Sequence, residues 1–312
     1  MGQRFSDIVA VRDGLAAAGY LADDAIAGAV FLADRLSKPV LVEGPAGTGK
    51  TELAKSVATM TGSRLIRLQC YEGLDESRAL YEWNYRRQLL RIQAERTVDG
   101  DGNGDGNSDG GRAGPGDGAA AGWSSVGDDL FSEEFLLARP LLEAIRATEP
   151  VVLLIDEADR LEVETEALLL EVLSDYQVSI PELGTVRATR IPLVFLTSNN
   201  TRELSEALKR RCLYLPLDYP DLEREREIVL ARVEGVSELL ADQVARLVRS
   251  LRQLELHKPP SVSETLDWAR TLVLLGAATV DVDRARATLP VLLKHRSDLA
   301  RAIRSLAENG VE

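Results

Sequence analysis

Uninterrupted apolar runs mark the strands that the sequence predicts. Residues 39–43, 151–155 and 192–197 are apolar almost throughout, and polar residues follow the second and third of these runs. A strand without polar alternation is typical of a sheet that is buried on both faces. Residues 64–70 alternate between apolar and polar side chains and predict a further buried strand. Because stretches with helical periodicity separate these strands, we expect a parallel α/β sheet that binds its ligand at the carboxyl ends of the strands.

Helical periodicity accounts for most of the remaining sequence up to residue 218. The first forty residues predict two amphipathic helices, and a short β-hairpin is expected at 177–190. Further helices are predicted at 77–96, at 135–145 with a turn or kink near Pro140, and at 163–176. In the helix at 77–96, four side chains are interpreted as packing residues rather than as a surface that stacks on bases: Tyr81, Tyr85, Leu89 and Ile92.

The pattern becomes wholly helical after Asp218. Apolar side chains repeat at i, i+3, i+4 and i+7 in the series Val244, Leu247, Val248 and Leu251. Ser261 and Glu264 form a capping-box signature at the start of a later helix. We therefore predict a domain boundary near Asp218, with an α/β core at 1–218 and an all-helical lid at 219–312.

Residues 97–122 break both periodicities because Asp, Gly and Asn dominate them. Such a segment cannot bury enough apolar surface to offset the entropy lost on ordering, so we predict a flexible surface insert. Its Asp-x-Asp-x-Asn spacing is similar to that of a calcium loop. The Glu at the twelfth loop position and the two flanking helices are missing, and a calcium site is therefore not expected.

Composition and charge narrow the classes of function. The net charge of −13 disfavours a nonspecific nucleic-acid binder, although an acidic total is compatible with a local basic patch. Two distant cysteines and two histidines supply neither a disulfide framework nor a zinc site. No apolar run approaches the roughly 20 residues that span a bilayer, and no signal peptide is visible. We expect a cytoplasmic protein without membrane insertion.

A glycine-rich octapeptide is the strongest functional signal in the chain. It consists of Gly44, Pro45, Ala46, Gly47, Thr48, Gly49, Lys50 and Thr51, and it stands between a predicted strand and a predicted helix. Glycines let successive backbone N–H groups point at one anion, and the helix N-terminus adds partial positive charge. Lys50 would reach the β- and γ-phosphates of a nucleotide, and the Thr51 hydroxyl would hold Mg²⁺. A plain Gly-rich turn is the alternative, but the strand–loop–helix setting favours nucleotide binding.

Two acidic residues, Asp156 and Glu157, follow the apolar run at 151–155. A carboxylate at Asp156 can hold the Mg²⁺ shell, usually through water. The side chain of Glu157 leaves in another direction and can polarise the attacking water. Taken alone, the pair could simply end a strand and begin a polar loop, but the glycine-rich octapeptide favours the catalytic interpretation.

Two further groups could serve phosphoryl transfer. Asn199 and Asn200 follow the run at 192–197, where an amide could orient the attacking water, although Asn is also a routine turn residue. The residues alone leave open which of the two is functional. Arg210 and Arg211 could stabilise charge on the transferring phosphoryl group, or could instead form a solvated basic helix end.

These signals, in this order, resemble the AAA+ ATPases, more narrowly the MoxR branch, and most of all the CoxD-like accessory ATPases that mature carbon monoxide dehydrogenase. The family-like segments are 68–75, 79–85, 135–142 and the hairpin at 177–190. The resemblance implies an α/β P-loop NTPase (AAA+) fold with a parallel sheet flanked by helices, a C-terminal all-helical lid, and ATP with Mg²⁺ as ligands. It also implies that Asn200 is the sensor 1 residue, with Asn199 as the fallback, and that Arg211 is the arginine finger, with Arg210 adjacent.

The resemblance further implies partners. An arginine finger in this family acts on the nucleotide of the neighbouring subunit, so we expect a homo-oligomer, as a hexameric ring. The expected client is a metalloenzyme, a molybdenum- or copper-containing dehydrogenase, beside a partner with a von Willebrand A domain and without nucleic acid. The alternative is a nucleic-acid motor or loader of the same fold. One departure concerns the lid, where Ser263 stands at the place of the family's sensor 2 arginine and Arg270 is a weak substitute.

Overall fold

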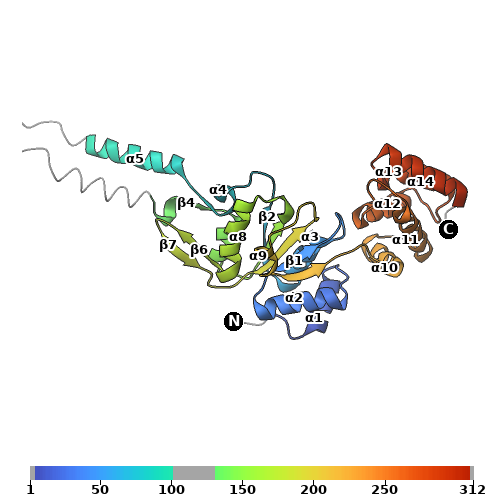
Figure 1. The fold of residues 1–312 in the computed structure, drawn as a ribbon, viewed down its shortest axis with the longest axis horizontal. Helices are drawn as coiled ribbons and strands as arrows, with labels where there is room; N and C mark the ends of the chain where they lie inside the picture. Colours follow the sequence, from blue (N-terminus) through green and yellow to red (C-terminus); the bar gives the residue numbers. More distant parts are fainter. Residues whose placement is uncertain (1–3, 101–130, 310–312) are drawn as a thin grey trace, which may run out of the picture.

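The computed structural model describes residues 4–100 and 131–309, and its centre is a five-stranded parallel sheet (Figure 1). The strands lie in the order β2–β5–β8–β1–β9. In chain order they are β1 (Val40–Glu43), β2 (Arg64–Gln69), β5 (Val151–Asp156), β8 (Leu193–Ser198) and β9 (Leu213–Pro216). The sheet predicted from the apolar runs is therefore confirmed. The sequence analysis missed β9, a short edge strand that becomes evident only where it pairs with β1.

Helices cover both faces of this sheet. On one face they are α1 (Ile8–Ala17), α2 (Asp24–Leu36) and α3 (Lys50–Thr61), and on the other they are α7 (Pro140–Arg146) and α8 (Val163–Asp175). Neighbouring residues of β5 point to opposite faces, so Val152 and Leu154 join the first hydrophobic cluster while Leu153 and Ile155 join the second. All four side chains are fully buried, as an uninterrupted apolar run predicts.

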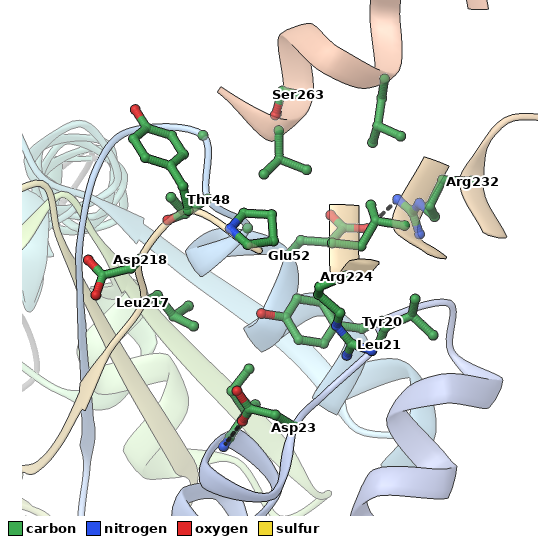
Figure 2. Close-up of a pocket in the computed structure, with 18 of the residues that line it drawn as sticks. Tyr20, Leu21, Asp23, Thr48, Glu52, Leu217, Asp218, Arg224, Arg232 and Ser263 are labelled. Carbon is green, nitrogen blue, oxygen red and sulfur yellow. Dashed lines mark hydrogen bonds and ion pairs between the residues drawn. The ribbon is translucent and has the colours of Figure 1, made fainter. Parts of the chain in front are cut away.

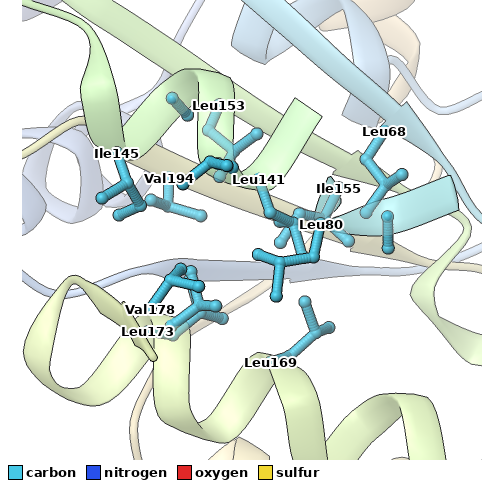
Figure 3. Packing of buried hydrophobic residues seen from close by; sticks show 14 of the residues in the cluster. Leu68, Leu80, Leu141, Ile145, Leu153, Ile155, Leu169, Leu173, Val178 and Val194 are labelled. Carbon is cyan, nitrogen blue, oxygen red and sulfur yellow. The ribbon is translucent and has the colours of Figure 1, made fainter. Parts of the chain in front are cut away.

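The cluster beneath α7 and α8 supports the strand ends that carry polar residues (Figure 3). Leu141 and Ile145 of α7 and Leu169 of α8 surround Leu153 and Ile155 of β5, and each of the five is fully buried. Burying a side chain of this size contributes about 1.5–3 kcal/mol. This packing fixes β5, and with it the position of the acidic pair at its carboxyl end.

The helices predicted at 77–96 and 135–145 are not continuous. Part of each instead forms a strand, and β3 (Tyr81–Trp83) pairs antiparallel with β4 (Leu136–Ala138). The segments meet although about fifty residues separate them in the chain, which local periodicity cannot reveal. Pro140 is the first residue of α7 rather than a kink within a helix, in agreement with the preference of proline for that position.

The segment around β3 also corrects the packing interpretation. A short helix, α4 (Glu76–Ala79), precedes β3, and α5 (Tyr85–Gly100) follows it. Tyr85 and Leu89 are 62% and 58% exposed, so the prediction that they pack was wrong. The helix α5 includes the first four residues of the predicted flexible insert, and residues 101–122 of that insert lie outside the described residues.

The hairpin predicted at 177–190 is confirmed. It consists of β6 (Gln177–Ile180) and β7 (Gly184–Arg187), which pair antiparallel. A short helix, α9 (Glu206–Lys209), lies between β8 and β9. The hairpin packs beside α7 and α8, on the same face of the sheet as the second hydrophobic cluster.

The C-terminal region is helical throughout and has a hydrophobic cluster of its own. Its helices are α10 (Leu222–Arg232), α11 (Glu238–Gln253), α12 (Val262–Leu274), α13 (Val282–Leu292) and α14 (Arg296–Asn309). The apolar repeat from Val244 to Leu251 is buried, and the capping box of Ser261 and Glu264 opens α12, as predicted. Within residues 4–100 and 131–309, no helix is both long and apolar enough to cross a membrane.

Candidate functional site

The glycine-rich octapeptide forms the turn from β1 into α3. Gly47 and Gly49 have φ values of 76° and 96°, a left-handed conformation that favours glycine. A Cβ on Gly44 would lie 1.9 Å from the carbonyl oxygen of Leu217, so only glycine fits there. Because α3 begins at Lys50 without a side-chain cap, its first N–H groups remain available to bind an anion.

Lys50 is buried against the loop that precedes it. Its Nζ donates hydrogen bonds to the carbonyl oxygens of Gly44, at 2.7 Å, and Pro45, at 2.6 Å. Burial lowers the pKa of the Lys50 ammonium, and the negative charge of Asp159 and of the acidic pair after β5 opposes that shift. The two carbonyl oxygens thus hold the lysine ammonium over the loop.

Asp156 and Thr51 come together from β5 and α3. The Thr51 hydroxyl donates to Oδ1 of Asp156 at 3.0 Å, and Thr197 of β8 donates to the same oxygen at 2.5 Å. Asp156 is almost completely buried. A carboxylate beside hydroxyl oxygens is the donor set that Mg²⁺ prefers, so the residues present fit this ion.

Glu157 is turned away from Asp156 by a left-handed backbone, with φ at 57°. This conformation costs a non-glycine residue about 1–3 kcal/mol and is common at functional sites. Its N–H donates to the Thr197 hydroxyl at 2.9 Å, and Arg160 pairs with its carboxylate at 2.9 Å. Asp156 and Glu157 have different partners, and both line the same hollow.

These residues share one hollow, which we call the loop cavity. It measures about 340 Å³, and its lining includes Lys50, Thr51, Arg67, Asp156, Glu157 and Asn199. Asn199 therefore lies with the glycine-rich loop and the acidic pair, whereas Asn200 does not line this cavity. Asn200 is exposed and adopts a left-handed turn with φ at 57°, in which its N–H donates to the Ser198 hydroxyl at 3.0 Å.

Arg210 and Arg211 lie at the end of α9, and both are exposed. The guanidinium group of Arg211 donates to the Ser174 hydroxyl and to the carbonyl oxygen of Ala207. Neither arginine lines the loop cavity of its own chain. The structure therefore does not bring them together with the other predicted site residues.

A larger hollow, which we call the junction cavity, is drawn in Figure 2. It adjoins the loop cavity, because Gly47, Gly49, Glu52 and Ser263 line both. It measures about 600 Å³ and is lined by the turn between α1 and α2, the glycine-rich loop, the segment after β9, and helices α10 and α12. Tyr20, Leu21 and Asp218 stand in this lining. Arg232 of α10 closes one side by donating to Glu52 at 3.0 Å and to the carbonyl oxygen of Gly19 at 3.1 Å.

The sequence analysis missed the junction cavity because its walls come from separate segments. No local pattern distinguishes Tyr20 or Asp218 from ordinary surface residues. Burial raises the pKa of the Tyr20 hydroxyl, and the negative charge of Asp23 adds to the shift, so this group stays neutral. With its mixed apolar and polar walls, the cavity can accommodate a nucleoside next to phosphates on the glycine-rich loop.

The start of α12 lies directly over the glycine-rich loop. A Cβ on Gly47 would lie 2.4 Å from Cβ of Ser261, and Ser263 lines both cavities. Arg270 pairs with Asp267 at 3.0 Å and lines neither cavity. Among the described residues of α12, Ser263 rather than an arginine therefore faces the loop.

Comparison with known proteins identifies the family. Residues 40–215 match the profile of the ATPase family associated with various cellular activities (AAA), which covers more than half of the chain. The chain belongs to this family, has its nucleotide-binding P-loop fold, and is an ATP hydrolase. No curated protein sequence matches it significantly.

Solved structures of the RuvB protein of Thermotoga maritima are similar in fold. The RuvB Holliday junction branch migration motor has 18% sequence identity and a TM-score of 0.43, with 86% of this chain and 67% of that chain covered. A second RuvB structure, of a single-residue variant, has 18% identity and a TM-score of 0.46, with 86% of this chain and 67% of that chain covered. At this identity the similarity concerns the fold alone.

Proposed function

We propose that this protein hydrolyses ATP within a homo-oligomeric ring and uses the energy to remodel a client metalloenzyme. The observation that carries the proposal is the loop cavity, in which Lys50, Thr51, Asp156 and Glu157 meet beside the anion-binding start of α3. The junction cavity next to it would hold the adenosine. The proposal includes the division into an α/β core at 1–218 and a helical lid at 219–312, which the separate hydrophobic cluster of the helical region supports.

The proposed chemistry transfers the terminal phosphoryl group of ATP to water. Lys50 and the loop N–H groups bind the phosphates, and Thr51 with Asp156 would hold Mg²⁺, which neutralises phosphate charge. Glu157 polarises the attacking water and accepts its proton as the water oxygen bonds to the γ-phosphorus. The bond from that phosphorus to the β–γ bridging oxygen breaks, so the products are ADP and phosphate.

We assign the orientation of the water to Asn199 rather than to Asn200, because only Asn199 lines the loop cavity. Asn199→Ala is expected to lower kcat by about 10²-fold, since one preorganised polar contact to the reacting groups is lost. Asn200→Gly is the matched control, because glycine keeps the left-handed turn without strain, and it should retain turnover. Steady-state phosphate release measures both, and the reverse ranking would return the role to Asn200.

We propose that Arg211, with Arg210 adjacent, completes the site of a neighbouring subunit. Both are exposed, and neither lines the loop cavity of its own chain. If Arg211 stabilises the transferring phosphoryl group, its guanidinium group therefore acts on the site of a second copy. A hexameric ring is the arrangement that the resemblance to MoxR-type proteins implies.

The client rests on the sequence resemblance to the MoxR branch and its CoxD-like members. It would be a molybdenum- or copper-containing dehydrogenase of the carbon monoxide dehydrogenase type, met in the cytoplasm beside a von Willebrand A domain partner. A nucleic-acid motor or loader is the alternative function. The net charge of −13 argues against that alternative, and the RuvB structures share only the fold.

Affinity capture tests the client. Glu157→Gln protein with ATP, recovered from its native cell, is expected to retain a metal-containing dehydrogenase or an A-domain protein, because blocked hydrolysis holds the client-bound state. The control is the Lys50→Ala/Glu157→Gln double variant, which should retain neither since it lacks the phosphate contact. Mass spectrometry and nuclease-sensitive staining identify the bound material, and nucleic acid in place of a dehydrogenase would favour the alternative.

A further inference from the structure

Arg67 of β2 reaches the loop cavity from the strand next to β5. Its Nε donates to Oδ2 of Asp156 at 3.0 Å, and its Nη2 donates to the same oxygen at 2.5 Å. The Arg67 side chain is 48% exposed, whereas that of Asp156 is 4% exposed. The pair therefore joins a fixed, buried carboxylate to a long cation that remains open to the cavity.

Three cations of the described residues line the loop cavity, and each has a polar partner; Arg67 donates to Asp156 and to Oε1 of Gln69. Lys50 is held by two loop carbonyl oxygens, and Lys55 lies 3.6 Å from the carboxylate of Glu52. Arg67 is the only guanidinium group among the described residues of the cavity lining. The helix α12 contributes the uncharged residue Ser263 to this lining. Arg67 is thus the one described residue of this lining able to give planar, forked hydrogen bonds to a phosphate.

Both oxygens of Asp156 already accept hydrogen bonds. Oδ1 accepts from Thr51 and Thr197, and Oδ2 accepts from Arg67. Arg67 and a divalent cation held near Asp156 would place two positive charges on one buried carboxylate. Their repulsion is strong where water is scarce. Arg67 is the group that can leave, because its side chain is long and half exposed.

We propose that Arg67 alternates between Asp156 and the terminal phosphate of ATP, and that it acts in cis on the reaction. In the structure its guanidinium group holds Asp156. With the nucleotide and its metal in place, the guanidinium group donates instead to a non-bridging oxygen of the γ-phosphate and stabilises the charge that develops there. This inference rests on the proposed ATP hydrolysis and assigns to β2 a contact that the lid does not provide.

Arg67→Ala tests the inference by binding as well as by turnover. We expect kcat to fall by about 10²-fold, since a donor to the transferring group is lost. Binding is measured by calorimetry with the ATP analogue that has an imido group between the β- and γ-phosphorus. The affinity for this analogue should fall roughly tenfold, whereas the affinity for ADP should not change. The Mg²⁺ concentration for half-maximal binding of that analogue should fall by about two- to fivefold, because a competing ion pair has been removed.

Two further variants complete the test. Arg67→Lys should recover part of the lost turnover and analogue binding, because lysine keeps the positive charge but cannot donate two parallel hydrogen bonds as a guanidinium group does. Arg64→Ala is the control, because Arg64 lies on the same strand and pairs with Glu143 and Glu149 outside the loop cavity. The role of Arg67 would be overturned if the Arg67→Ala protein turned over ATP at the wild-type rate. It would also be overturned if this variant lost affinity for ADP and for the analogue equally and needed more Mg²⁺. Absence of ATPase activity in the wild-type protein would instead overturn the proposed function.

Discussion

Replacement of Glu157 by Gln is expected to stop ATP turnover while ATP binding persists. The change keeps the size of the side chain and its strained turn but removes the carboxylate that we propose accepts the proton of the attacking water. General base catalysis contributes about 10²–10⁴-fold to rate, so kcat should fall within that range. Bound nucleotide then remains ATP, and the assembled oligomer should persist longer than the wild type does.

Phosphate release, together with chromatography of the nucleotide bound to the purified oligomer, measures this effect. Glu164→Gln is the matched control, since it makes the same chemical change at an exposed position in the first turn of α8. Normal hydrolysis by Glu157→Gln protein would show that another group is the base. Loss of ATP binding in this variant would show instead that the acidic pair contributes to affinity.

Arg211→Ala is expected to leave nucleotide binding intact and to abolish turnover. Arg211 lies outside the loop cavity of its own chain, so its loss removes nothing from the phosphate contacts of that chain. An arginine supplied to the transition state contributes about 10³–10⁵-fold to kcat in related phosphoryl transfers. Arg210→Ala, measured beside it, decides which of the two exposed residues has the role.

Mixing Arg211→Ala protein with Lys50→Ala protein tests whether the site is shared between subunits. One variant keeps Lys50, the proposed phosphate ligand, and the other keeps Arg211, so some interfaces in a mixed ring regain both. Random mixing in equal amounts restores about a quarter of the interfaces of a heterologous ring. ATPase activity should therefore pass through a maximum as the mixing ratio is varied. A mixture that stays inactive at every ratio would exclude a shared site.

The sequence by itself determined the fold class and the position of the glycine-rich loop. Both follow from local rules: uninterrupted apolar runs require a sheet covered on both faces, and the spacing of Gly44, Gly49 and Lys50 requires a curled loop at a helix start. The acidic pair after β5 was found for the same reason, since a strand end followed by Asp and Glu is visible within a short stretch of sequence.

The tertiary structure alone decided which residues meet around that loop. Periodicity could not show that 81–83 and 136–138 pair as strands, because the partner of each lies far away in the chain. Adjacency in sequence made Asn199 and Asn200 equivalent until the left-handed turn at Asn200 separated them. Arg67 meets Asp156 across 89 residues because β2 and β5 are neighbours in the sheet. Such contacts depend on strand order, which no local pattern of apolar and polar residues specifies.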